Sequence, residues 1–302
     1  MRLALAFFGS LLVAGPDAGF WTYWGDGQAE LSSYDLVEPH YGQPRRGVAI
    51  LIFVTETFSN SVRVKADPGK HPKSDEFPVM KLNLMKDFQT GIYDYHDMTS
   101  SFLALEAVNG RPAGSLTKVS FSSQEWCGHV YHELWFDSRA IRSTRHSYFD
   151  GEADQQTDLK YPAGGISEDA LFFWARGIAQ AEVKPGQSRT VSLLRSLQGA
   201  RDRHVPVGWS PATLSRSANA RQISVPAGKF QSEVWTAKSG DVTWTFYVEK
   251  AGPNRILRWE TSTGEKAELL ATERMKYWQM NQPGGEEALK KLRLSPRPPR
   301  TT

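Results

Sequence analysis

The sequence is built largely from short segments in which apolar residues alternate with polar ones or follow one another without interruption. Residues 29–37 alternate, as in a half-buried strand, and residues 47–54 form the continuous apolar run of a central strand. Turn-forming pairs such as Asn109-Gly110 and Asp150-Gly151 separate such segments. The same patterns predict strands at 79–85, 99–108, 116–122, 125–136, 141–149, 157–161, 213–217, 222–225, 230–237, 242–248, 256–261 and 267–275.

Helical patterns are few. Ser167 can cap a helix at about 167–178, on which Leu171 and Trp174 lie in one apolar stripe. A short terminal helix is predicted at 286–292. A parallel sheet would need a helix between most strands. The pattern therefore predicts a mainly β fold, a curved antiparallel sheet forming an open barrel or a sandwich, with one or two helices.

The N-terminus is typical of an export signal. Arg2 precedes an apolar segment at 3–14, and small residues allow cleavage near Ala18. The apolar run is too short to span a membrane as a helix, and Pro16 stands where a lipoprotein signal would carry its acylated cysteine. We therefore expect a signal peptide at 1–18 and a periplasmic or secreted mature protein with no lipid anchor and no transmembrane span. The alternative is a buried N-terminal strand or helix of a cytosolic protein.

The predicted elements divide the remaining chain into three regions. We expect an N-terminal β-rich region at 19–208, an antiparallel β region at 209–281 packed on it, and a short helix with a disordered tail at 282–302. The 302 residues suffice for one large β domain or two smaller ones. A net charge of only +3, without a basic block interleaved with aromatic residues, argues against nucleic-acid binding.

Aromatic residues are abundant, with ten tryptophans in the chain. Rings near the mature N-terminus and in the C-terminal strands can fill a closed core, which we expect, or line an apolar cavity for a lipid or peptide. They are Trp21, Tyr23, Trp24, Trp235, Trp244, Tyr247 and Trp259.

The only cysteine lies in the densest cluster of reactive side chains. As one strand, residues 125–136 place Cys127, His129 and Glu133 on one face, and residues two apart are about 6.5–7 Å apart at Cα. A neighbouring imidazole lowers the pKa of a thiol, and Glu125 or Glu133 could orient that imidazole. A single cysteine forms no internal disulfide, so we favour a shielded structural thiol over a catalytic one.

Three carboxylates have partial calcium-loop spacing. Asp150, Glu152 and Asp154 occupy the first, third and fifth positions of such a loop. Gln155 and Tyr161 stand where the loop needs its glycine and its bidentate glutamate. We expect a solvated turn, with a weak cation site as the alternative, and no cofactor.

Two motifs carry a resemblance to known proteins. Ser123-Gln-Glu-Trp-Cys-Gly128 and Val225-Pro-Ala-Gly-Lys-Phe230 resemble stretches of an uncharacterised family of exported bacterial envelope proteins. The C-terminal part is similar to lipoprotein-carrier-like open β-barrels. The resemblance implies a fold and a location outside the cytoplasm, and it supplies no catalytic residue.

Together these observations favour an exported, non-catalytic β-rich protein with a binding or structural role in the envelope. Its ligand or partner is unknown, with an apolar ligand or an envelope component as the candidates. The alternative is an extracytoplasmic hydrolase or thiol enzyme that uses Cys127 and His129.

Overall fold

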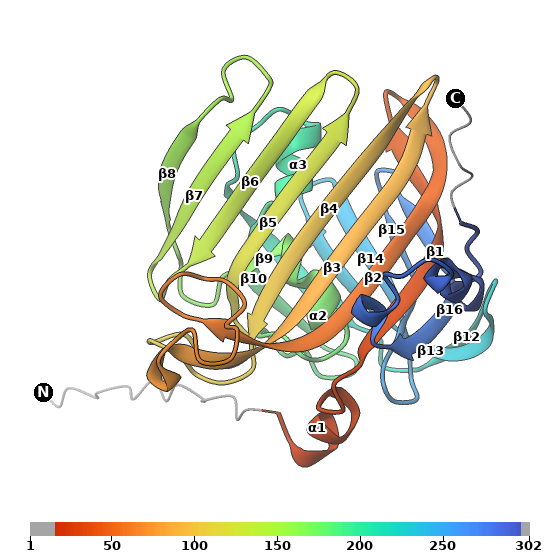
Figure 1. Cartoon of the computed structure of the whole chain (residues 1–302), viewed down its shortest axis with the longest axis horizontal. Coiled ribbons are helices and arrows are strands. Elements are labelled where there is room, and N and C mark those ends of the chain that lie inside the picture. The colour runs from red at the N-terminus through yellow and green to blue at the C-terminus, as the bar shows by residue number, and fades with distance from the viewer. Residues whose placement is uncertain (1–15, 297–302) are drawn as a thin grey trace, which may run out of the picture.

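A single curved sheet of sixteen strands forms an open barrel in the computed structural model, which describes residues 16–296 (Figure 1). The strands are β1 (Ala29–His40), β2 (Gln43–Ser59), β3 (Glu76–Thr90), β4 (Tyr93–Ala104), β5 (Leu116–Glu125), β6 (Gly128–Phe136), β7 (Ala140–Ser147), β8 (Gln155–Lys160), β9 (Ile166–Ser167), β10 (Ser188–Leu194), β11 (Trp209–Arg216), β12 (Arg221–Val225), β13 (Gly228–Ser239), β14 (Val242–Glu249), β15 (Ile256–Thr261) and β16 (Lys266–Met275).

Helices in the described chain are short. The α-helices are α1 (Ala18–Trp24), α2 (Leu171–Ala175) and α3 (Leu197–Asp202), and the 3-10 helices are η1 (Lys73–Asp75), η2 (Glu168–Ala170), η3 (Tyr277–Gln279) and η4 (Gly285–Leu292).

The order of strands joins the two ends of the chain. It runs β8-β7-β6-β5-β4-β3-β2-β1-β16-β15-β14-β13-β11-β10-β9, and β12 pairs with β13. Strand β1 lies between β2 and β16, so the regions before and after residue 208 contribute to one sheet. All pairings are antiparallel except that of β9 with β10. The open seam lies between β8 and β9, the two ends of this order, and Trp209 at the start of β11 reaches β8, where its Nε1 donates to the Lys160 carbonyl at 3.0 Å.

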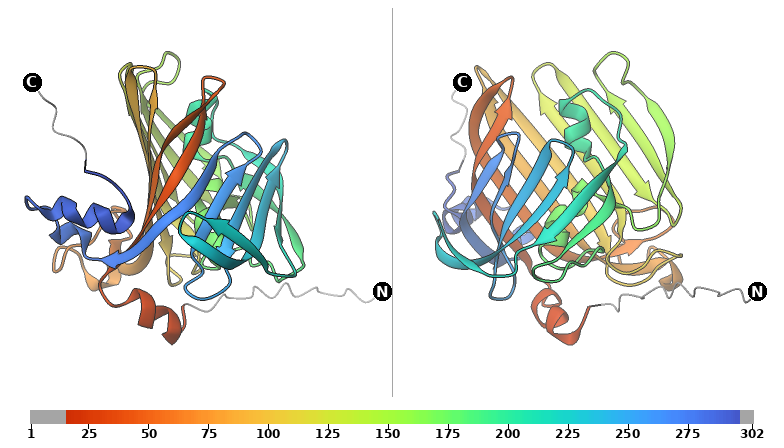
Figure 2. Two further views of the ribbon diagram at one scale, coloured as in Figure 1. Left: turned by 90° about the vertical axis from the view of Figure 1, so that its right-hand side faces the viewer. Right: turned by 180° about the vertical axis from the view of Figure 1, so that it is seen from behind.

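The inner face of the sheet is apolar at the lower end of the barrel and polar at the upper end. We call the end with the β1–β2, β3–β4, β5–β6 and β7–β8 turns the upper rim, as in Figure 1. The lower interior is packed around α2, all of whose residues are buried, with Phe173 against Phe53 and Trp174 against Trp235. Figure 2 shows α2 inside the barrel. The upper interior is polar, because Lys86 on β3 and Asp97 on β4 also face inward and are buried.

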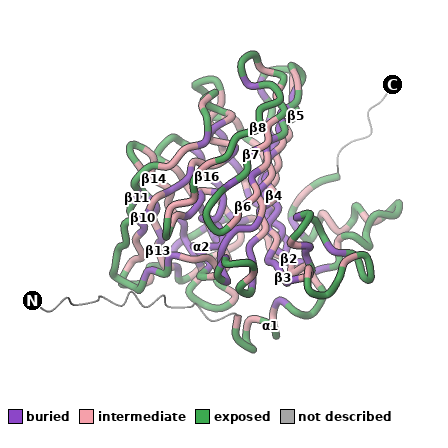
Figure 3. Tube along the Cα trace, turned by 90° about the vertical axis from the view of Figure 1, so that its left-hand side faces the viewer, coloured by how far each residue is buried: buried purple, intermediate pink, exposed green. Residues whose placement is uncertain are grey.

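The outer face is covered only in part. Buried residues follow the strands, and the turns are mostly exposed (Figure 3). The C-terminal segment with η3 and η4 covers the outer face near β1, β2 and β16, where Leu31, Ile52 and Leu292 form a separate apolar cluster. The hydroxyl of Ser33 donates to the Leu292 carbonyl at 2.5 Å and fixes the far end of this segment.

The predicted fold class is confirmed, and each predicted strand overlaps an observed one. The single strand at 125–136 is wrong, because Trp126 and Cys127 form a turn between β5 and β6. The helix at 167–178 is a 3-10 turn followed by α2, and it ends before Gly177, whose φ of +75° stops it. Residues 1–15 of the expected signal peptide (1–18) and residues 297–302 of the expected tail lie outside the described residues.

Candidate functional site

Cys127 is at an exposed hairpin tip, which corrects the expectation of a shielded thiol. Its backbone N–H donates to Oε2 of Glu125 at 2.7 Å, and the adjacent Glu125 carboxylate raises the pKa of the thiol. His129 pairs with Gln124 across the hairpin and is exposed, while Glu133 bonds Tyr131 and Lys118 further down β6. No hydrogen bond or ion pair joins Cys127 to His129 within residues 16–296, so the sequence cluster is not brought together as a catalytic group.

The reactivity of Cys127 follows from this geometry. Although the thiol is exposed, we expect slow alkylation by iodoacetamide at pH 7, because the carboxylate disfavours the reactive thiolate. Glu125→Gln removes that charge and is expected to raise the alkylation rate several-fold at this pH. Rate constants measured for both proteins across pH check this. Fast alkylation of the wild-type protein, unchanged in the variant, would revive the thiol-enzyme alternative.

The three candidate calcium ligands are directed to different partners. Glu152 lies 3.6 Å from Arg145 and 2.8 Å from His204, and Asp154 lies 2.6 Å from His146. Asp150 is exposed. Within the described part of the chain, no group of three or more His, Cys, Asp or Glu side chains is placed to hold a metal ion.

A buried ion cluster occupies the upper interior. Nζ of Lys86 lies 3.0 Å from Glu38 and 2.7 Å from Glu265, and all three side chains are buried. Burial opposes the charged form of Lys86, but Glu265 and Glu38 outweigh it and raise the pKa of the lysine. Burial raises the pKa of Glu38 to about 8. Ion pairs of Lys86 with Glu38 and Glu265 therefore connect β3 to β1 and to the β15–β16 turn in the polar part of the interior.

A small cavity opens beside this cluster. It has a volume of about 290 Å³, and Glu38, Glu265, Glu168 and the Trp244 ring lie in its wall. Because Glu38 and Glu265 both form ion pairs with Lys86, these carboxylates stabilise the fold and are not free to bind a ligand. We assign the cavity no ligand.

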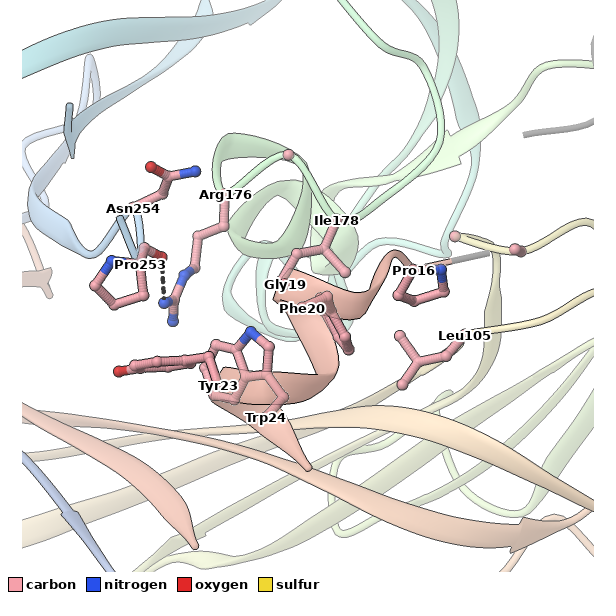
Figure 4. Close-up of a pocket in the computed structure, with 13 residues that line it drawn as sticks. Pro16, Gly19, Phe20, Tyr23, Trp24, Leu105, Arg176, Ile178, Pro253 and Asn254 are labelled. Carbon is pink, nitrogen blue, oxygen red and sulfur yellow. Dashed lines mark hydrogen bonds between the residues drawn. The ribbon is translucent and has the colours of Figure 1, made fainter. Parts of the chain in front are cut away.

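The lower end of the barrel holds a second pocket, about 310 Å³ in volume, between α1 and the loop after α2 (Figure 4). Arg176 reaches into it between Pro253 and the rings of α1. Its guanidinium donates to Glu30 at 2.6 and 3.2 Å and to the Pro253 carbonyl at 2.9 Å, and it lies 5.0 Å from the Trp24 ring. Burial works against the Glu30 charge, but Arg176 outweighs it and lowers the pKa of Glu30. This cation is thus engaged in holding α1 in the barrel mouth.

The third pocket lies outside the barrel, under the C-terminal segment. It has a volume of about 560 Å³ and is bounded by the outer face of β1, β2, β3 and β16 and by η3 and η4. Three exposed polar residues, Asn281, Gln282 and Glu286, also line it. Its apolar wall consists of Leu31, Ile50, Ile52, Met85, Met275, Tyr277, Met280, Ala288, Leu289 and Leu292.

The aromatic residues that the sequence singled out divide between core and pockets. Trp24, Trp235, Tyr247 and Trp259 are buried, and Trp21 is exposed. Tyr23 and Trp24 line the lower pocket, and Trp244 lines the upper cavity.

Sequence reasoning missed Lys86 and the C-terminal pocket. A signal for Lys86 was present, since it continues the inward alternation of Met80, Leu82 and Leu84 at the end of an apolar strand. The pocket has no local signal, because Leu31 and Leu292 are brought together only by the pairing of β1 with β16 and the return of the C-terminal segment.

Comparison with known proteins gives little about activity. No protein-family model and no curated protein matches the sequence. A solved structure is similar to this chain. It is a β-barrel-like protein of a domain of unknown function, DUF1849, from Brucella abortus, 12% identical, with a TM-score of 0.46 over 82% of this chain and 98% of that one. A likeness of this size says nothing of ligand or reaction. Among the described helices, none has the length and apolar character to cross a membrane.

Proposed function

We propose that this chain is an exported, non-catalytic envelope protein that binds a single apolar chain, such as a fatty acyl chain, in the pocket under the C-terminal segment. The observation that carries the proposal is the apolar wall of that 560 Å³ pocket. The N-terminal segment of the sequence supports the export part of the proposal.

The size and lining of the pocket suit a flexible hydrocarbon. Ligand sites are typically apolar cavities of about 300–1,000 Å³ with a few polar groups that orient the ligand. Here Asn281, Gln282 and Glu286 are exposed beside the apolar wall, so a polar head group can reach water. Each buried methylene contributes about 0.8 kcal/mol. About ten of them give about 8 kcal/mol, from which association takes at least about 4 kcal/mol, so we expect a Kd in the millimolar range for a chain of this length.

The C-terminal segment can admit such a chain by a local movement. It is anchored at Met275 and Leu292, both buried, and the residues between them are mostly exposed. Gly284 adopts a φ of +93° in the middle of this stretch. Few buried contacts between the anchors mean that the segment opens at low cost while the sheet stays intact.

Titration with dansyl-labelled undecanoic acid tests the ligand site. We expect dansyl emission to rise and shift to the blue with the wild-type protein. Ala288→Phe, which fills the pocket, is expected to abolish the change. Ala163→Phe is the matched control at an exposed loop position near another cavity, and it should bind the probe as the wild type does.

Two results would contradict the proposal. An unchanged dansyl spectrum with the wild-type protein would exclude the apolar ligand, and equal binding by the Ala288→Phe variant would place the probe elsewhere. N-terminal sequencing of protein recovered from the periplasm of a bacterial host tests export separately.

A further inference from the structure

The upper rim carries a row of exposed apolar side chains at four successive hairpin turns. Tyr41 is 64% exposed, Ile92 76%, Trp126 69% and Tyr148 65%. They belong to the β1–β2, β3–β4, β5–β6 and β7–β8 turns, which lie side by side along the upper edge in Figure 1. Single exposed apolar residues are ordinary, but here one stands at each of four neighbouring turns, which makes this edge a candidate interaction site. We call these four residues the rim row.

Two rings of the rim row, those of Trp126 and Tyr41, are linked through a chain of contacts to the buried Tyr95. Trp126 lies 6.1 Å from the Tyr93 ring, and Tyr93 lies 5.9 Å from Tyr95, which is buried. The hydroxyl groups of Tyr95 and Tyr41 are 2.7 Å apart. This chain of contacts links three of the four turns, so the exposed rings lose little freedom on binding a ligand.

Backbone features at two turns also serve the exposed rings. Tyr41 has a φ of +52°, in the left-handed region where glycine or asparagine is the usual residue of such a turn. The ring of Tyr148 lies against Gly128, and a Cβ at residue 128 would come within 2.4 Å of it. Tyr41 therefore occupies a backbone conformation that disfavours a tyrosine, and Gly128 leaves space for the ring of Tyr148. Such departures from local preference are expected at functional positions.

The turns that carry the rim row are acidic, and arginines lie beside them: Arg145 is 3.6 Å from Glu152 and Arg201 is 4.1 Å from the Phe149 ring. Residues 40–43, 90–94, 124–129 and 147–155 contain five acidic residues and no lysine or arginine. The turns themselves therefore offer no lysine or arginine side chain to an anionic lipid surface or a phosphate-bearing polymer. Carboxylates, side-chain amides and tyrosine hydroxyl groups, in contrast, hydrogen-bond well to the hydroxyl groups of a neutral ligand.

The shape of the rim row suits a linear polymer. Neighbouring hairpins are two strands apart, which is about 10 Å, so the row is about 30 Å long and one side chain wide. A folded protein partner would need about 800 Å² on each side, and a single file of four residues does not supply this. In a β-1,4-linked glycan every second sugar presents the same C–H face, at a repeat similar to the separation of the hairpins, and such faces stack on aromatic rings.

We propose that the upper rim binds a neutral β-1,4-linked glycan strand along the rim row. Trp126 and the two tyrosines stack on sugar faces, and Ile92 adds an apolar contact between them. Acidic and amide side chains of the turns, such as Asp94 and Gln43, accept and donate hydrogen bonds to the sugar hydroxyl groups. This site is separate from the C-terminal pocket and does not depend on an apolar ligand there.

Calorimetric titration with the soluble hexamer of N-acetylglucosamine tests this proposal. We expect the wild-type protein to bind with a Kd below about 1 mM, and Trp126→Ala and Tyr148→Ala each to weaken binding by about tenfold or more, as truncation of an anchoring aromatic does. The matched control is Trp278→Ala, an exposed tryptophan of the C-terminal segment that should bind as the wild type does. Thermal melting confirms that the variants are folded.

Several outcomes would overturn the proposal. They are no heat of binding at millimolar hexamer, or an equal loss of affinity in the Trp278→Ala variant. Binding of deca-lysine or of phosphatidylglycerol vesicles that depends on Trp126, without binding of the hexamer, would assign the rim to a basic polypeptide or to a membrane instead. None of these results bears on the dansyl titration of the C-terminal pocket.

Discussion

Replacing Lys86 with methionine is expected to lower the free energy of unfolding by about 3–5 kcal/mol at pH 8. Methionine has a similar length but removes the cation that lies 3.0 Å from Glu38 and 2.7 Å from Glu265. Two carboxylates then remain in an interior where Lys86 itself is only 2% exposed. Breaking a buried pair costs more than the pair contributes, because the partner charges lose their compensation.

The loss should depend on pH. Burial already raises the pKa of Glu38, and loss of the lysine raises it further. A carboxyl group whose pKa is raised by folding stabilises the protein while it is protonated, and this contribution disappears as the pH rises through the folded-state pKa. Urea unfolding at pH 5 and pH 8 should therefore show a smaller deficit at pH 5.

A control on the same strand separates the buried charge from the substitution itself. Lys81 is also on β3 but pairs at 3.3 Å with Glu56 at a partly exposed position. Lys81→Met should cost no more than about 1 kcal/mol. Equal losses of stability for the two variants would contradict the claim that buried ion pairs of Lys86 hold the upper interior together. So would a loss in the Lys86→Met variant that is the same at pH 5 and pH 8.

Replacing Arg176 with methionine is expected to cost a similar amount, about 3–5 kcal/mol. The guanidinium is paired with Glu30 at 2.6 Å, donates to the Pro253 carbonyl, and lies 4.4 Å from the Phe53 ring and 5.0 Å from the Trp24 ring. Its loss leaves Glu30 buried without a cation and loosens α1. We therefore expect earlier proteolysis within α1 as well as a lower free energy of unfolding.

A double-mutant cycle tells a charge effect from lost packing. Glu30→Gln in the Arg176→Met protein removes the uncompensated carboxylate and should restore about 1–2 kcal/mol. Thermal melting and urea unfolding of the four proteins measure the coupling. Strictly additive losses would mean that the pair is not an interacting unit.

Much of the architecture is readable from the sequence because its signals are local. Alternation and the continuous run at 47–54 locate the strands, and Gly-containing turns separate them. The β5–β6 turn was missed because Glu125-Trp126-Cys127 has no Asn, Asp, Gly or Pro before Gly128, and the alternation continues through it. Helix α2 is shorter than its periodicity implies, because the first turn is a 3-10 helix and Gly177, with a φ of +75°, ends it.

The functional regions were less predictable because they are assembled across the chain. The C-terminal pocket joins residues near 31, 52, 85 and 290, which no local pattern connects. The upper rim depends on which turns fall at the same end of the sheet, and the strand register decides this. Cys127 and His129 are close in the sequence, but the turn at 126–127 places Cys127 beside Glu125, and no hydrogen bond joins it to His129 in the described part of the chain.

Hydrogen–deuterium exchange with and without palmitic acid tests most directly that the C-terminal segment covers an apolar ligand. We predict slower exchange in residues 275–292 and in the middle of β2, with little change at α1 and at the upper rim. Unaltered exchange in the C-terminal segment, or protection confined to α1 and the loop after α2, would contradict this and move any apolar ligand to the lower pocket.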